Sequence, residues 1–285
     1  MRSISNANSN VAAACPSQKS ATVQVCLQHI RNATVKLKYA GVTFLIDPML
    51  AEKGRYPGLP GTYQSHIRNP TVDLPLPASE IIDDVDAVIL THAHPDHWDE
   101  TAEALIPRDI RVFVQNQLDA KTIRSQNFEN VTILADKEDF RGVSIYRTEG
   151  IHGSKDLYSM SGIGEILGEV MGVVLKSYGQ QTVYIAGDTV WGSEVQEALQ
   201  LFKPEITVLN AGHAVLEGLD DHPILMGKEA VKQVALAAPS TRIVAVHLEA
   251  INHCTLSRTE LRSYLDDHGI GDRVLIPEDG GLLML

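Results

Sequence analysis

The stretch THAHPDHWDE at residues 91–100 constrains this chain more than any other part of its sequence. It brings three of the chain's 11 histidines together with two aspartates, directly after the apolar run AVIL at residues 87–90. A short apolar run of this kind predicts a buried strand. The strand would therefore end in a loop that is dense in imidazole and carboxylate groups.

The spacing inside this loop favours a metal site. If the chain stays extended, alternate side chains share one side, which would group His92, His94 and Asp96. His97 would then point elsewhere unless the chain turns there. The spacing therefore offers two groups of donors, His92 with His94 and Asp96 with His97. Imidazole nitrogens and carboxylate oxygens suit zinc, iron or manganese.

A plainer explanation is that the aspartates only cap a helix, which we expect at residues 99–106. Capping explains Asp99 well, because aspartate is a favoured residue just before a helix. It explains none of the three histidines. We therefore prefer the metal site.

Composition limits the alternatives. The chain has 285 residues, 44% of them hydrophobic, which is enough for a large core in one big domain or two small ones. Its net charge of −12 disfavours nucleic acid as a partner and leaves a small-molecule substrate as the expectation. The 3 cysteines are widely spaced and suggest neither a disulfide framework nor a metal knuckle, so a reducing, cytoplasmic compartment is expected.

The N-terminal residues 1–21 are rich in serine, asparagine and alanine, and we expect a disordered tail. Their apolar run, residues 11–15, is too short for a signal peptide. No apolar run in the chain approaches the roughly 20 residues of a membrane span.

The rest of the chain predicts two sheets with helices outside. An antiparallel meander opens it, with strands at 23–27, 34–39 and 42–46 and a stop at Asp47-Pro48. Helices are expected at 99–106, 117–125, 193–202, 225–237 and 257–267. Further strands are expected at 87–90, 111–114, 131–134, 142–148, 168–176, 181–186, 205–209, 242–246 and 273–276. A meander followed by alternating strands and helices fits such a layered fold.

Residues 51–77 contain five prolines and three glycines without periodicity, and we expect a long loop there. Loops of this length are often lids or binding segments, although a plain surface insertion explains the pattern equally well. If the loop crosses the predicted metal site, Arg55, Tyr56, Tyr63 and Arg68 are the side chains best able to select a substrate.

THAHPDH resembles the HxHxDH signature of the metallo-β-lactamase superfamily. Three later pieces fit the same pattern: His152 after the strand at 142–148, the sequence GDT at 187–189, and His247 after the strand at 242–246. The resemblance implies a four-layer αββα sandwich with two mixed sheets and outer helices. It covers residues 22–285, which we therefore expect to form a single domain.

The resemblance also implies a site with two divalent ions. One ion would take His92, His94 and His152, the other would take Asp96, His97 and His247, and Asp188 would bridge them. Zinc is the expected metal, with manganese or iron as alternatives. His253 lies close to His247 in sequence and is the alternative last ligand.

A dinuclear site of this family implies a hydrolase in which a metal-activated water attacks a small ester, lactone or phosphodiester. Asp96 would orient that water or move a proton. The hairpin that ends at residues 45–48 resembles the branch that contains L-ascorbate-6-phosphate lactonase and N-acylphosphatidylethanolamine phospholipase D. The segments 68–75, 187–191 and 247–254 resemble a bacterial or fungal hydrolase group of that branch. The alternatives are an iron-dependent oxidoreductase or dioxygenase on the same fold, and a non-catalytic metal-binding relative.

Four side chains are candidates for substrate contact: His222, Arg55, Arg68 and Trp98. For the two arginines plain solvent exposure is the competing explanation, and for the tryptophan it is packing under the loop. A homo-oligomer is compatible with the sequence, which gives no specific signal for one.

Overall fold

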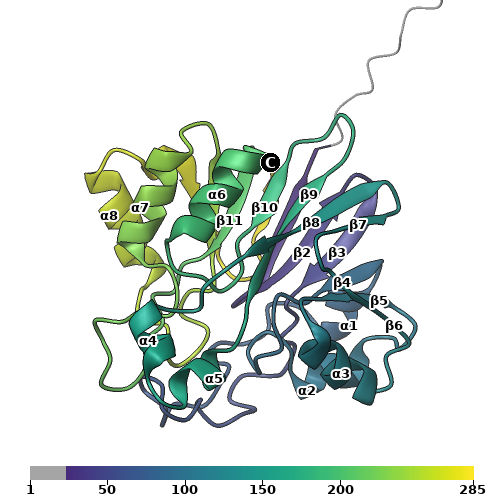
Figure 1. The fold of residues 1–285 in the computed structure, drawn as a ribbon, viewed down its shortest axis with the longest axis horizontal. Helices are drawn as coiled ribbons and strands as arrows, with labels where there is room; N and C mark the ends of the chain where they lie inside the picture. Colours follow the sequence, from purple (N-terminus) through teal and green to yellow (C-terminus); the bar gives the residue numbers. More distant parts are fainter. Residues whose placement is uncertain (1–23) are drawn as a thin grey trace, which may run out of the picture.

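Two seven-stranded sheets lie face to face at the centre of the protein, as the ribbon in Figure 1 shows. The computed structural model describes residues 24–285, so the predicted tail at residues 1–21 lies outside the described residues. The first sheet contains β1 (Cys26–Arg31), β2 (Thr34–Tyr39), β3 (Val42–Ile46), β4 (Ala87–Ile89), β5 (Arg111–Val114), β6 (Asn130–Ile133) and β14 (Leu282–Met284). The second contains β7 (Lys137–Phe140), β8 (Val143–Glu149), β9 (Met171–Lys176), β10 (Val183–Ile185), β11 (Ile206–Asn210), β12 (Arg242–Val246) and β13 (Val274–Leu275).

Both sheets are mixed. In the first, the order is β14-β1-β2-β3-β4-β5-β6, with antiparallel pairs as far as β3 and parallel pairs beyond it. In the second, the order is β13-β12-β11-β10-β9-β8-β7, parallel as far as β10 and antiparallel beyond it. The predicted antiparallel meander is therefore confirmed as β1, β2 and β3.

Helices cover the outer faces of the two sheets. The helices are α1 (Ala78–Ile82), α2 (Glu100–Leu105), α3 (Gln117–Ser125), α4 (Lys155–Ser159), α5 (Ile163–Leu167), α6 (Ser193–Phe202), α7 (Lys228–Ala237), α8 (Arg258–Asp267) and the 3-10 turn η1 (Gly271–Arg273). Figure 1 shows α1 to α3 beside the first sheet and α6 to α8 beside the second. In the part of the chain that the structure describes, no helix is both long and apolar enough to cross a bilayer.

Three buried clusters define four layers. Phe44 and Val173 belong to the cluster between the sheets, to which strands of both contribute. Val88 packs with Ala102 of α2 on the outer side of the first sheet, and a third cluster joins the second sheet to α6, α7 and α8. This arrangement confirms the predicted αββα sandwich.

The bounds of the elements differ from the predictions in a few places. The segments at 111–114, 117–125, 193–202 and 242–246 agree, whereas β1 begins at Cys26 instead of residue 23. The helix expected from residue 225 begins at Lys228, because Gly227 caps it and Leu225 packs in a separate apolar cluster. The short elements α1, α4, α5, β7 and β14 were not predicted.

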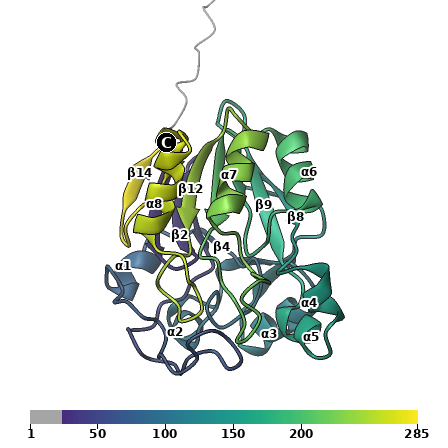
Figure 2. The same cartoon turned by 90° about the vertical axis from the view of Figure 1, so that its left-hand side faces the viewer.

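Residues 51–77 form a long loop without a helix or a paired strand, as predicted. Asn252 holds it from inside: its side-chain amide donates to Thr62 Oγ1 at 2.8 Å and to the Tyr63 carbonyl at 2.6 Å, and its Oδ1 accepts from Asn69 Nδ2 at 2.6 Å. The loop runs along the bottom of the molecule in Figure 2, at the same end as α4 and α5. This end is also where the loops that follow β4, β8, β10 and β12 meet.

Candidate metal centre

Seven predicted ligands gather at this end of the two sheets. The motif loop, defined as residues 91–99, follows β4 of the first sheet. His152, Asp188 and His247 follow β8, β10 and β12 of the second sheet. Each side chain leaves a strand end, so the rigid sheets bring together residues that are far apart in the chain.

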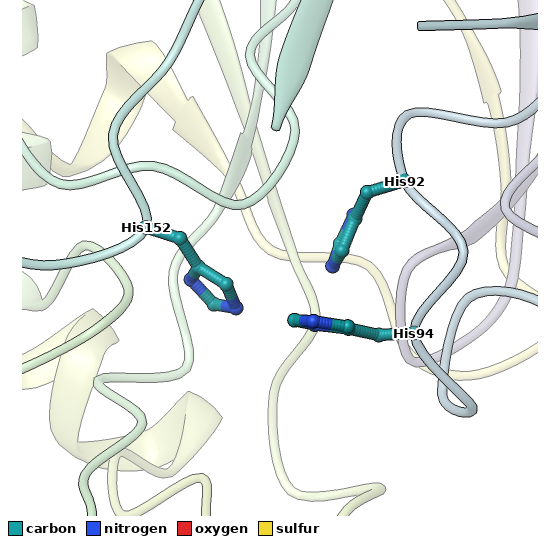
Figure 3. A group of neighbouring side chains, drawn as sticks. All are labelled: His92, His94 and His152. Carbon is teal, nitrogen blue, oxygen red and sulfur yellow. The ribbon is translucent and has the colours of Figure 1, made fainter. Parts of the chain in front are cut away.

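The first group consists of His92, His94 and His152. Their candidate ligand atoms all lie within 4.8 Å of one another. Figure 3 shows the rings of His92 and His94, from the motif loop, and the ring of His152, from the opposite side, pointing toward one another. This arrangement could hold one metal ion.

The second group consists of Asp96, His97, Asp188 and His247, and its candidate ligand atoms also lie within 4.8 Å of one another. Asp96 belongs here because the motif loop turns: the backbone N–H groups of His97 and Trp98 both donate to the His94 carbonyl at 2.9 Å. The turn therefore groups Asp96 with His97, as the spacing also offers, and not beside His92 and His94, where a fully extended chain would have placed it.

Asp188 lies between the two groups. Its Oδ2 is 3.9 Å from His92 Nε2 and 3.7 Å from His152 Nε2, both of the first group. The same oxygen is 3.1 Å from His97 Nε2, and Oδ1 is 3.7 Å from His247 Nε2. A single carboxylate thus reaches both groups.

The backbone at Gly187 explains why a glycine precedes Asp188 in the GDT sequence. Its φ is +67°, and a Cβ at this position would lie 2.5 Å from the Met171 carbonyl oxygen. Only glycine combines this backbone conformation with so close an approach to the neighbouring strand. The tight turn directs Asp188 toward the histidines.

Asp47 orients two of the histidines. Its Oδ2 is 2.9 Å from His97 Nδ1 and accepts a hydrogen bond from Thr91 Oγ1 at 2.7 Å. Because the Thr91 hydroxyl uses its proton on Asp47, it accepts from His92 Nδ1 at 3.1 Å. Both imidazoles are therefore held through Nδ1, which directs Nε2 into the site.

The other ligands also have fixed partners. His152 Nδ1 donates to the Ile224 carbonyl at 2.8 Å, and Asn210 Nδ2 donates to Asp188 Oδ1 at 2.6 Å. His94 Nε2 donates to the Ile166 carbonyl at 2.9 Å, so in the neutral ring the lone pair lies on Nδ1. His247 Nδ1 lies 3.4 Å from Cys254 Sγ.

The residues fit a pair of divalent ions. Within residues 24–285, the buried Nε2 atoms of His92 and His247 have no hydrogen-bond partner, which is costly unless another group binds them. Seven donors also exceed the four that a tetrahedral ion uses. Imidazole and carboxylate donors of this kind suit zinc, manganese or iron.

The two groups differ in electrostatics. Burial lowers the pKa of His152 to about 4 and holds the pKa of His92 well below its usual value. Burial acts in the same direction on His97, but Asp188, Asp47 and Asp96 overcome it and raise the pKa of that imidazole to about 10. The carboxylates therefore concentrate their effect on the second group.

Two further predicted residues lie beside the groups. His253 is buried, burial lowers its pKa to about 4, and it is not among the seven grouped donors. His222 is half-buried, and its Nδ1 lies 3.5 Å from Ser154 Oγ, two residues after His152.

Trp98, Arg55 and Arg68 lie further from the ligands. Trp98 packs edge-on against Phe128 and lines a cavity of about 380 Å³ beside the motif loop. Arg55 and Arg68 are exposed, and the Arg68 guanidinium donates to the carbonyls of Gly54 and Arg55 within its own loop.

The sequence did not reveal the residues that orient the ligands. The sequence identifies Asp47 only as a strand stop, and it assigns no role to Thr91, Asn210 or Cys254. The one sequence feature that could have pointed to Asp47 is its place directly after a strand, at the edge where the predicted ligands also lie.

Comparisons with known proteins agree with this site. The model of the beta-lactamase superfamily domain matches residues 43–248. The UPF0173 protein YddR of Bacillus subtilis (strain 168) is 42% identical over 255 residues, which are 89% of this chain and 97% of that protein. The superfamily resemblance is thereby confirmed, and the narrower lactonase and phospholipase branch stays a prediction.

Two solved structures are also similar along most of their length. An isothiocyanate hydrolase from Delia radicum gut bacteria is 48% identical with a TM-score of 0.88, over 91% of this chain and 99% of that chain. A possible metal-dependent hydrolase from Veillonella parvula DSM 2008 is 39% identical with a TM-score of 0.90, over 92% of this chain and 100% of that chain. The chain therefore belongs to the UPF0173 family of the beta-lactamase superfamily and is a metal-dependent hydrolase.

Proposed function

We propose that this hydrolase is dinuclear. The first ion takes His92, His94 and His152, the second takes Asp96, His97 and His247, and Asp188 bridges them. The observation that carries the proposal is the position of Asp188, whose Oδ2 lies within 3.9 Å of imidazole nitrogens from both groups. Both sheets contribute ligands, which supports the further proposal that residues 22–285 work as one domain.

The chain's own residues would position the water and move its proton. Two divalent ions, when bound, would lower the pKa of a nearby water toward ~7 and stabilise negative charge on the group that is attacked. Burial alone would raise the pKa of Asp96, but His97 and His247 hold it well below its usual range, so its carboxylate stays ionised. An ionised carboxylate can orient the water and accept its proton, which is the catalytic role we assign to Asp96.

We propose a small neutral electrophile as the substrate, with an isothiocyanate as the first candidate and an ester or lactone as the second. The similarity to an isothiocyanate hydrolase at 48% identity supports this order. Addition of water to R–N=C=S forms a C–O bond at the central carbon. Cleavage of the C–N bond, with both protons ending on nitrogen, then gives R–NH₂ and COS.

The segments that cover the ligands, which we call the cover, are α4, α5 and residues 214–225. Their composition favours a neutral substrate rather than a phosphodiester. An apolar cluster joins α4 and α5 to the segment at 214–225, with Leu157, Leu167, Ile224 and Leu225 buried in it. Among the described residues, none of the ion pairs made by the seven ligands involves a lysine or an arginine. Phosphate recognition generally uses such cations.

His222 is the candidate we retain for direct contact with the substrate. It lies on the 214–225 segment, and its neighbour Ile224 holds His152. We keep Trp98 as a candidate through the cavity that it lines beside the motif loop. Arg55 and Arg68 would contact only a substrate that extends out to the exposed loop.

The test uses protein purified without chelator. Metal content is measured by elemental analysis, and turnover is measured on a panel of benzyl isothiocyanate, a phenyl ester, a γ-lactone and bis-p-nitrophenyl phosphate. We expect about two ions per chain and release of benzylamine that stops when the metals are removed and returns when zinc or manganese is added.

Other outcomes would change the proposal. Turnover of the phosphodiester alone would overturn the neutral substrate, and a folded, stable protein without metal would overturn the site. Bound iron with turnover that requires oxygen would favour the oxidoreductase alternative instead. Two bound ions without turnover of any panel member would favour a non-catalytic relative.

A further inference from the structure

Asn32 occupies the turn between β1 and β2 and is completely buried at the edge where the ligands meet. Its φ of 55° lies in the left-handed region, which asparagine adopts more readily than most residues with a side chain. No sequence motif pointed to it. A buried polar residue in this backbone conformation suggests a specific purpose.

Two hydrogen bonds connect Asn32 to the second group of ligands. Its side-chain Nδ2 donates to the backbone carbonyl of Asp96 at 2.9 Å. Its backbone carbonyl accepts from the N–H of His247 at 2.9 Å. Asp96 lies in the loop after β4 of the first sheet and His247 follows β12 of the second, so one residue connects ligand segments from both sheets.

The turn that carries Asn32 is itself held in place. His29, which is also completely buried, donates from Nε2 to the Asn32 carbonyl at 3.0 Å. The N–H of His29 donates to the Gly281 carbonyl at 2.9 Å, which ties the turn to the C-terminal segment. Asn32 is therefore a fixed point from which both ligand segments can be spaced.

We infer that Asn32 is a positioning residue that sets the distance between His247 and the pair Asp96 and His97. The inference rests on the proposed dinuclear site. Metal–ligand bonds are about 2.0–2.2 Å long, so a shift of a few tenths of an ångström in one segment weakens binding. Outer partners of metal ligands typically account for about 10–100-fold in metal affinity or activity.

The variant Asn32→Gly removes the amide that holds Asp96 and keeps the left-handed backbone and the carbonyl that holds His247. The matched control is Asn127→Gly. Asn127 also has a left-handed φ, 67°, but it is exposed at the end of α3. The control therefore reports the effect of a new glycine in this conformation without any contact to the ligands. Asn32→Asp is a second variant, because it preserves size and backbone preference but cannot donate to Asp96.

Zinc titration of the metal-free full-length proteins gives the main readout, and the absorption bands of the cobalt(II) forms give the second. We expect the first ion to bind Asn32→Gly and Asn32→Asp as it binds the wild type. The second ion should bind them about 10–100-fold more weakly, with altered cobalt bands, whereas Asn127→Gly should match the wild type.

If either Asn32 variant binds both ions as tightly as the wild type does, the inference is overturned and the proposed function stays intact. The inference is also overturned if Asn127→Gly weakens binding of the second ion as much as Asn32→Gly does. If the wild type binds no second ion, the proposed dinuclear function fails first. Should Asn32→Gly fail to fold, Asn32→Asp decides the question with the same titration.

Discussion

The two groups of candidate ligands are held by different parts of the molecule. In the first group, His94 and His152 donate to the carbonyls of Ile166 and Ile224, which lie in the segments that cover the site. In the second group, His97 and Asp188 are held by Asp47 and Asn210, which lie at strand ends. Two of the three residues in the first group therefore depend on the covering segments, while His92 is held through Thr91 by Asp47, and the second group depends on the strand ends.

The comparison extends to protonation. Burial keeps His92 and His152 neutral at ordinary pH, so their lone pairs are available to a metal. His97 sits among carboxylates that raise its pKa to about 10, and without metal it carries a proton. A metal entering the second group must displace that proton, whereas His92 and His152 of the first group have none to lose.

Asp188 offers the largest test, since its Oδ2 lies within 3.9 Å of imidazole nitrogens from both groups. In Asp188→Ala the carboxylate that reaches His92, His152, His97 and His247 is lost, and the imidazoles remain without a shared anion. We expect both ions to bind poorly and kcat/KM to fall by more than about 10³-fold, on the scale seen when machinery that acts as a unit is broken. Elemental analysis and steady-state kinetics measure the two effects, and retention of both ions would contradict the bridging role.

His247 and His253 test where the second group ends. His247→Ala should remove one of the two ions and lower turnover by about 10²-fold. Loss of a residue that supports a metal ligand typically lowers metal affinity or activity by about 10–100-fold, and loss of a ligand itself should cost at least the upper end of that range. His253→Ala should leave the stoichiometry unchanged, since its ring is not among the seven grouped donors. Elemental analysis of both variants decides the assignment. Loss of an ion from His253→Ala but not from His247→Ala would mean that His253 is the ligand.

The pH dependence of binding sharpens the comparison. Below about pH 10, metal binding at the second group displaces the His97 proton, so affinity should rise about tenfold per pH unit for each proton released. At the first group, the pKa of His152 is about 4 and burial holds the pKa of His92 well below its usual value, so these two imidazoles should release no proton between about pH 5 and 8. Calorimetric zinc titrations in buffers of different ionisation enthalpy count the protons. Equal slopes for the two ions would refute the difference.

The candidate ligands of the motif loop were predictable because they are local in the sequence, whereas His152, Asp188 and His247 came from the family resemblance. The motif loop directly follows an apolar strand, and Asp188 directly follows β10 in a glycine turn. Strict alternation in an extended chain would place Asp96 beside His92 and His94, but a turn at His94 groups it with His97. The turn depends on backbone hydrogen bonds, which spacing does not encode.

The partners of the ligands were not predictable. His152 and His94 bind backbone carbonyls, and any residue type supplies a carbonyl, so no sequence signal marks Ile224 or Ile166. The cover was missed for a similar reason: α4 and α5 span one turn or so each, and helices this short show no apolar periodicity. Asn32 joins segments more than 60 residues away, a relation that only the folded sheets create.

The loop at residues 51–77 gives the smallest expected effect. Its inner side is fixed by Arg31, a fully buried residue whose guanidinium donates to the carbonyls of Met49, Ala51 and Val72. Tyr63 adds a backbone hydrogen bond to the Val215 carbonyl, so the loop is tied to the segment that covers the ligands. Shortening 54–66 would remove the Tyr63 tie together with the side chains, and single substitutions are the cleaner test.

Substitutions of Arg55 and Arg68 distinguish two roles of the loop, recognition of substrate charge and maintenance of its own shape. Both are exposed, but the Arg68 guanidinium holds two carbonyls of its own loop, so Arg68→Ala loosens the loop and Arg55→Ala removes charge alone. For a neutral substrate that is cleaved under the apolar cover, we expect Arg55→Ala to change kcat/KM by less than about 2-fold, as exposed charges contribute little. Arg68→Ala should alter relative kcat/KM across the substrate panel by about 3-fold with both ions still bound. A large loss from Arg55→Ala, confined to anionic substrates, would instead show that the loop recognises charge.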